Sequence, residues 1–141
     1  MTQNQSTESL DVGFRAGERY DVTVRGHRVT VDQPVDAGGE DVAPTPTELF
    51  VASLATCVAF YAGRYLTRHG RSRDGLGVSV SYWMAGDRPA RVADIQLTVR
   101  VPQDLPAERW AGLHAVVSHC TVHNSLVNPP TVRIDVAGVG R

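Results

Sequence analysis

The sequence contains no lysine, and all 14 of its basic residues are arginine. The absence of lysine excludes Schiff-base chemistry and a lysine general base, and it leaves arginine as the only side chain that is always cationic at neutral pH. Neither sign of charge is in excess, because 15 acidic residues bring the net charge to -1. This balance gives no electrostatic reason to expect a nucleic acid or an anionic membrane as a partner.

Long hydrophobic runs and a secretion signal are also missing. Arg64 and Arg68 interrupt the most apolar stretch, so no uninterrupted apolar run approaches the roughly 18 residues that a membrane span requires. The first ten residues have neither the basic n-region nor the apolar h-region of a signal peptide, and we therefore expect a cytoplasmic protein. In that reducing compartment the two cysteines, Cys57 and Cys120, are expected to be buried hydrophobes or reactive thiols instead of a permanent disulfide.

The bulk composition is that of one globular domain. The chain has 141 residues, of which 42% are hydrophobic and 21% are charged. We expect residues 1–8 to be a disordered tail and residues 9–141 to form a single domain.

One stretch, residues 48–69, predicts a long helix. Its apolar residues recur at spacings of three and four, which places them on one buried face. Thr45 is suited to the N-cap, Pro46 to the first helical position, and Glu48 to the carboxylate of a capping box. Gly70 is suited to the end of the helix. A helix of this length spans a small domain, so we expect it to be central to the fold.

The other elements are predicted from alternation of apolar and polar residues and from turn signals. Strands are expected at 10–14, 20–24, 29–32, 76–84, 92–101 and 131–136, and helical segments at 107–119 and 122–126. This order predicts an α+β fold with antiparallel strands around one long central helix. Because a lone chain of this size would leave the long helix partly uncovered, we also expect a homodimer that packs two such helices together.

The two cysteines are the main candidates for chemistry. Cys57 lies mid-helix beside the apolar stripe, where an unpaired cysteine is often only a small buried hydrophobe. Cys120 favours a reactive role, because it starts a helical turn whose backbone N–H groups stabilise a thiolate. His119, Cys120 and His123 could alternatively bind a metal ion, although the second pair of ligands usual in such sites is missing.

Glu48 can be explained as a capping residue alone. It precedes Cys57 by two and a half helical turns, about 13 Å along the axis, which is too far for a hydrogen bond between the two side chains. An arginine from elsewhere, held by Glu48 and reaching toward the thiolate, would connect them. Such an arginine would lower the pKa of the thiol and bind an oxyanion.

Several motifs occur in a characteristic order, namely Asp32-Gln33-Pro34, Gly38-Gly39-Glu40-Asp41, Pro44-Thr45-Pro46-x-Glu48-Leu49, Cys57 and Cys120-x-Val122-His123. Together they resemble the OsmC/Ohr family of organic hydroperoxide reductases, in its OsmC-like branch, over about residues 19–136. The resemblance implies an OsmC-like fold, an intertwined homodimer with two sites built from both chains, and a thiol peroxidase without metal or flavin. The sequence departs from the family at Thr121, where proline is usual, and at Ala43, where glycine is common.

The resemblance also implies roles for the cysteines. Cys57 would be the peroxidatic thiolate, which becomes a sulfenic acid while an organic hydroperoxide is reduced to an alcohol. Cys120 would be the resolving thiol that forms a Cys57–Cys120 disulfide. A dithiol reductant, lipoyl-type or a small thiol, would then reopen that disulfide.

In the family the counterpart of Glu48 holds an arginine from an N-terminal loop or hairpin. Arg15, which precedes the predicted hairpin, is our preferred candidate for this arginine, and Arg28 is the reserve. Arg19 and Arg25 lie in the same region of the sequence.

A different class of function fits the same pattern. The protein could be a small-molecule or lipid-binding module, or a thiol redox sensor, in which the cysteines do not turn over. We favour the peroxidase, with organic hydroperoxides as substrates, because the apolar helix face around Cys57 includes Phe50, Phe60 and Tyr61 and would suit an alkyl group.

Overall fold

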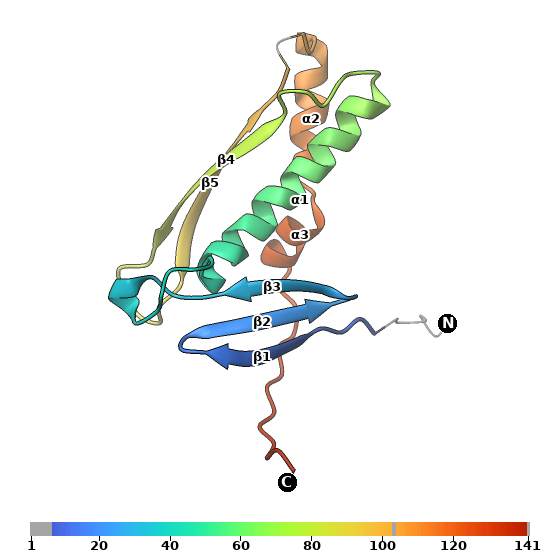
Figure 1. Ribbon diagram of the computed structural model, residues 1–141. Helices are drawn as coiled ribbons and strands as arrows, with labels where there is room; N and C mark the ends of the chain where they lie inside the picture. Colours follow the sequence, from blue (N-terminus) through green and yellow to red (C-terminus); the bar gives the residue numbers. More distant parts are fainter. Residues whose placement is uncertain (1–6, 103, 141) are drawn as a thin grey trace. The chain divides into compact units, whose positions relative to one another are not determined.

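The computed structural model describes residues 7–102 and 104–140 (Figure 1). The chain divides into two compact units, with the boundary between Val51 and Ala52. Of the predicted disordered tail, residues 1–6 lie outside the described residues, and residues 7 and 8 have no regular secondary structure. The single domain expected over residues 9–141 stays a prediction.

The first unit contains an antiparallel sheet of three strands in the order β1-β2-β3. The strands are β1 (Asp11–Ala16), β2 (Arg19–Val24) and β3 (His27–Val31), which confirms the three strands predicted here. The turn between β2 and β3 lies at Arg25 and Gly26. Both residues have positive φ angles, 49° and 81°, as a two-residue type I′ turn requires.

A buried carboxylate organises the loop that follows β3. The Asp32 side chain is 1% exposed and accepts hydrogen bonds from the backbone N–H groups of Gln33, Glu40 and Val42 at 2.8, 3.2 and 3.2 Å. Burial raises the pKa of Asp32, but these three donors and the charge of Arg19 outweigh it and bring the pKa below its usual value. The charged carboxylate therefore closes the loop that leads to the long helix.

The long helix is α1 (Pro46–Arg68), close to the predicted range. Its capping box is confirmed, because the Glu48 N–H donates to Thr45 Oγ1 at 3.1 Å and the Thr45 N–H donates to Glu48 Oε1 at 2.8 Å. Gly70 ends the helix as predicted, with a φ of 68° that a side chain would disfavour.

The second unit contains the rest of α1, a two-stranded antiparallel sheet and two short helices. The strands are β4 (Gly77–Met84) and β5 (Val92–Arg100), close to the predicted ranges, and they pair antiparallel. The predicted helix at 107–119 is divided into a 3₁₀ turn at Ala107–Arg109 and α2 (Trp110–Val117). The last helix is α3 (Thr121–Val127). The α+β fold class is confirmed.

The predicted strand at 131–136 is wrong for the described chain, which forms no strand there. The alternating side chains of Val132, Ile134 and Val136 are 73%, 85% and 97% exposed. A strand forms only where its backbone N–H and C=O groups pair with a neighbour, and this segment has no such neighbour among the residues described.

Within the second unit, α1 supplies one face of the core. Two buried clusters contain α1 residues together with residues that follow β5, and they consist of Leu54, Val58 and Cys120, and of Ala62, Tyr65, Leu66, Leu105 and Leu113. By length and composition alone α1 could also cross a membrane. Its buried face, packed against β5 and α2, is that of the core helix of a globular fold (Figure 1).

Candidate active site

The structure brings the two cysteines into one apolar cluster. Cys57 in α1 packs against the buried group of Leu54, Val58 and Cys120. Both cysteines are free, and Cys57 is partly buried while Cys120 is completely buried. A partly exposed thiol beside a buried one can form a disulfide once the exposed thiol has been oxidised.

Cys120 also caps α3, because its Sγ accepts the His123 N–H at 3.4 Å. Burial raises the pKa of the Cys120 thiol, the adjacent Cys57 acts in the same direction, and the His123 N–H opposes both. The net effect raises the pKa of Cys120, so this residue is held as a thiol at neutral pH. The surroundings of Cys120 therefore disfavour its thiolate form.

A hydrogen bond joins the neighbours of the two cysteines. Tyr61 lies one helical turn after Cys57, and its hydroxyl shares a hydrogen bond of 2.9 Å with the hydroxyl of Thr121, which follows Cys120. Proline, the usual family residue at this position, could not make this bond. The departure at Thr121 therefore supplies a contact between α1 and α3.

The two histidines beside Cys120 are used locally. The Nδ1 atom of His119 lies 2.8 Å from the Ala115 carbonyl oxygen, and the Nδ1 atom of His123 lies 2.6 Å from that of Ser118. Because a carbonyl can only accept, both ring nitrogens donate. Within residues 7–102 and 104–140, no group of three His, Cys, Asp or Glu side chains is arranged to hold a metal ion.

Glu48, Arg15 and Arg28, which were predicted to assist the thiols, all belong to the first unit. Glu48 has its capping role, and no arginine among the described residues forms an ion pair with it. Arg15 lies at an irregularity in the β1–β2 pairing, with its Nη1 3.6 Å from Asp21 Oδ1. Arg28 approaches the same carboxylate, with its Nε 3.9 Å from Oδ2.

Arg19 differs from these two arginines. Its Nη2 lies 3.8 Å from Glu40 Oε1, and its Nε is buried with no hydrogen-bond partner in the part of the chain that the structure describes. A buried N–H group without a hydrogen-bond partner lowers the stability of the fold unless an acceptor from elsewhere accepts its hydrogen bond. In the sequence, Arg19 is one of several arginines near the N-terminus, and no pattern distinguishes it from the others.

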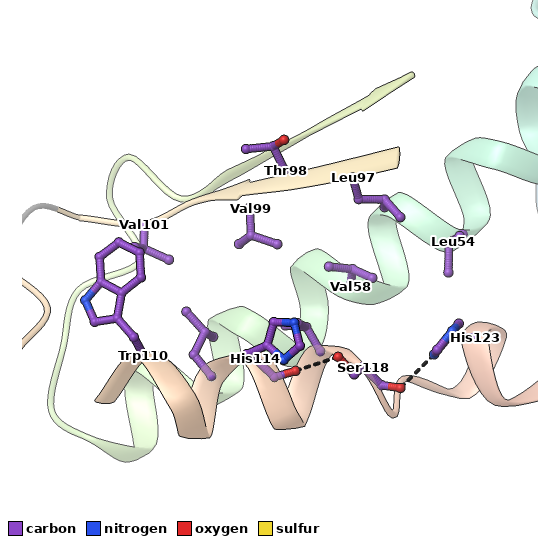
Figure 2. Close-up of a pocket in the computed structure, with 12 residues that line it drawn as sticks. Leu54, Val58, Leu97, Thr98, Val99, Val101, Trp110, His114, Ser118 and His123 are labelled. Carbon is purple, nitrogen blue, oxygen red and sulfur yellow. Dashed lines mark hydrogen bonds between the residues drawn. The ribbon is translucent and has the colours of Figure 1, made fainter. Parts of the chain in front are cut away.

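A pocket of about 440 Å³ lies between α1, β5 and α2 (Figure 2). It is lined mainly by apolar side chains, and the lining residues are Leu54, Val58, Leu97, Thr98, Val99, Val101, Trp110, Leu113, His114, Val117, Ser118 and His123. Figure 2 shows Trp110 and Val101 toward one end and Leu54 and His123 toward the other. Leu54 and Val58 belong to the cysteine cluster as well, whereas the cysteines themselves are not lining residues. Apolar and polar residues alternate in β5, and this pattern accounts for Leu97 and Val99 in the lining of the pocket. No pattern in the sequence predicted the pocket itself.

Comparisons with known proteins agree with the predicted fold. No curated protein sequence matches the chain. The chain is similar to the structure of a candidate osmotic stress induced and detoxification response protein from Psychrobacter arcticus, with 24% identity, 86% of this chain and 89% of that chain covered, and a TM-score of 0.77.

Two further structures resemble it. The first is an organic hydroperoxide resistance protein OsmC from Legionella pneumophila, with 16% identity, 86% and 91% coverage of this and that chain, and a TM-score of 0.62. The second is a candidate organic hydroperoxide resistance protein from Vibrio cholerae with captopril in one of its active sites, with 18% identity, 92% coverage of both chains and a TM-score of 0.59. These likenesses confirm the OsmC-like fold. The model of the OsmC-like protein family matches residues 38–135, so the chain belongs to that family, as its motifs predicted.

Proposed function

We propose that this protein is a thiol-dependent peroxidase that reduces organic hydroperoxides to alcohols. The observation that carries the proposal is the pair of free thiols, Cys57 and Cys120, in one apolar cluster with unequal exposure. Membership of the OsmC-like family supports it, as do the similar structures that are named organic hydroperoxide resistance proteins.

The proposed reaction begins at Cys57. Its thiolate sulfur attacks the distal oxygen of the hydroperoxide, the O–O bond breaks, and the leaving alkoxide takes a proton to become the alcohol. Cys57 is oxidised to a sulfenic acid. The sulfur of Cys120 then attacks the Cys57 sulfur and displaces hydroxide, which leaves as water with the thiol proton, and a disulfide forms. A dithiol reductant, lipoyl-type or a small thiol, returns both cysteines to thiols and is itself oxidised to a disulfide.

The different surroundings of the two thiols support this division of roles. Cys57 is partly exposed, so an external peroxide can approach it, whereas Cys120 is completely buried. The raised pKa of Cys120 keeps it protonated until the sulfenic acid is formed next to it. The His123 N–H that donates to its Sγ then stabilises the negative charge that develops during attack.

An arginine completes the proposal. Held by Glu48, it would pair with the Cys57 thiolate and orient it toward the peroxide. Arg15 is our preferred residue, and its position at the β1–β2 irregularity supports it, because such bulges redirect a side chain. Arg28 remains the reserve, and the unpartnered Nε of Arg19 makes that residue a further candidate.

The apolar pocket supports an organic peroxide as the substrate. Leu54 and Val58 line the pocket and also pack in the cysteine cluster, so the hydrocarbon part of a peroxide would bind beside the thiols. A volume of about 440 Å³ is within the range of small-molecule sites.

We further propose a cytoplasmic homodimer. Reduced thiols require a reducing compartment. The alternating side chains of Val132, Ile134 and Val136 are exposed in the single chain, and a second copy could cover them by pairing this segment as a strand.

A non-catalytic binding module or a thiol redox sensor on the same fold is the alternative. The observation that favours it is that neither cysteine lines the apolar pocket. A binding module would bind apolar ligands and leave peroxide unconsumed, and a sensor would form the disulfide without steady-state turnover.

Steady-state reduction of cumene hydroperoxide by a dithiol tests the proposal. We expect turnover by the wild-type protein, none with Cys57→Ser, and a single turnover that stops at the sulfenic acid with Cys120→Ser. Mass spectrometry after one equivalent of peroxide is expected to show a 57–120 disulfide. Turnover that survives Cys57→Ser would exclude the mechanism, and a disulfide without turnover would favour the sensor.

A further inference from the structure

A second concave site lies between α1 and α2, separate from the apolar pocket. It has a volume of about 290 Å³ and is lined by Tyr61, Arg64, Tyr65, Arg68, Val116 and His119. No residue is shared with the lining of the apolar pocket. The lining contains two arginines and no carboxylate, so its permanently charged side chains are all cationic.

The two arginines are four residues apart on α1 and therefore lie on the same helical face. Like charges at this spacing destabilise a helix slightly unless an anion lies between them. Neither Arg64 nor Arg68 forms an ion pair with any acidic residue within the described ranges. The Arg64 guanidinium lies over the Phe60 ring, 5.6 Å from its centroid, in a cation–π contact.

Tyr61 and Tyr65, which form other walls of the groove, are held by hydrogen bonds to residues that do not line it. The Tyr65 hydroxyl donates to the Arg109 carbonyl oxygen at 2.9 Å, and Tyr61 is bonded to Thr121. His119 donates from Nδ1 to the Ala115 carbonyl oxygen at 2.8 Å, which fixes its ring in the wall of the groove. The groove thus combines two aromatic rings with two arginines that form no ion pair among the described residues.

We propose that this groove binds a small organic anion. Its carboxylate or phosphate head group would lie between Arg64 and Arg68, because guanidinium groups bind such planar or tetrahedral oxyanions with paired hydrogen bonds. Its apolar body would pack on Tyr61, Tyr65 and Val116. A volume of about 290 Å³ lies at the low end for ligand sites and suits a molecule with a single ring.

This site does not depend on turnover by the cysteines. It is nevertheless linked to them, because Tyr61 lines the groove and is hydrogen-bonded to the residue after Cys120. An anion bound in the groove would contact the residue that connects the two cysteine-bearing segments.

The test is an NMR titration of the reduced full-length protein, at constant ionic strength, with benzoate, phenyl phosphate and the neutral benzamide. We expect benzoate and phenyl phosphate, but not benzamide, to shift amide signals of residues 61–68 and 116–119. Whichever of the two anions binds more tightly identifies the head group. The same titration with Cys57→Ser is expected to give the same result, which separates this site from the proposed peroxidase.

Arginine variants supply the decisive comparison. Arg64→Gln and Arg68→Gln are each expected to weaken anion binding by about threefold, and the double variant by about tenfold, as for exposed charge pairs. Arg88→Gln removes the same charge from an exposed loop and is expected to leave binding unchanged. Equal binding of benzamide, equal losses in Arg88→Gln, or no shifts at millimolar ligand would each overturn the proposal.

Discussion

The hydroxyl groups of Tyr61 and Thr121 share a hydrogen bond of 2.9 Å, and each of these residues lies close in sequence to one of the two cysteines. Tyr61 belongs to α1, as does Cys57, and Thr121 begins α3, which Cys120 caps. The bond therefore connects the two segments that must stay together for a disulfide to form.

Removing this bond is expected to loosen the thiol pair. Tyr61→Phe and Thr121→Val should each lower the free energy of unfolding by about 0.5–1.5 kcal/mol and slow disulfide formation after peroxide addition. Urea unfolding of both single variants and the double variant measures the coupling energy between them. Strictly additive losses would show that the bond contributes nothing.

The two thiols are expected to differ in reactivity toward iodoacetamide. Because the pKa of Cys120 is raised, its thiolate fraction at pH 7 is smaller than that of an ordinary cysteine, and its burial slows access further. In the single-thiol variants, Cys120 should be alkylated more slowly than Cys57, and its rate should keep rising with pH beyond about pH 8.5, where the rate of an ordinary cysteine begins to level off. Mass spectrometry of timed samples gives both rates. Equal rates at pH 7 would contradict the assignment of the buried thiol as the protected one.

Asp32 should contribute stability that depends on pH. Its folded-state pKa is lowered, so its contribution is fully present above the unfolded pKa of about 3.9 and is lost as the pH falls through the folded value. We expect Asp32→Asn to lower the Tm at pH 7, and the difference from wild type to narrow below about pH 4. Thermal unfolding of both proteins, followed by circular dichroism at pH 7 and below pH 4, measures this difference in Tm. Asp36→Asn, at an exposed position of the same loop, is the control and should leave the Tm unchanged.

The choice of arginine can be decided by kinetics. Arg15→Gln is expected to lower kcat/KM for cumene hydroperoxide by about a hundredfold, the usual cost of losing one charge-stabilising group. Arg28→Gln and Arg19→Gln serve as comparisons, since each removes the same charge from the first unit. A large loss confined to Arg19→Gln would transfer the role to that residue, whose Nε is buried without a partner among the described residues.

Local features could be predicted from the sequence because they depend on neighbours along the chain. The capping box of Thr45 and Glu48 and the stop at Gly70 are set by residues within one or two turns. Alternation of apolar and polar residues in the same way predicted the positions of strands β4 and β5. The predicted strand at 131–136 failed because pairing needs a partner that the sequence pattern alone does not supply.

The sequence by itself determined which residues could react: two cysteines, no lysine, and arginine as the only permanent cation. Only the tertiary structure decided that Cys57 and Cys120 share one cluster, that one is buried and the other partly exposed, and that Tyr61 reaches Thr121. Burial and contact between distant segments arise from packing of α1 against β5, α2 and α3. The periodicity of the sequence does not predict that packing, because the packing depends on which faces of the helices and strands contact one another in the folded chain.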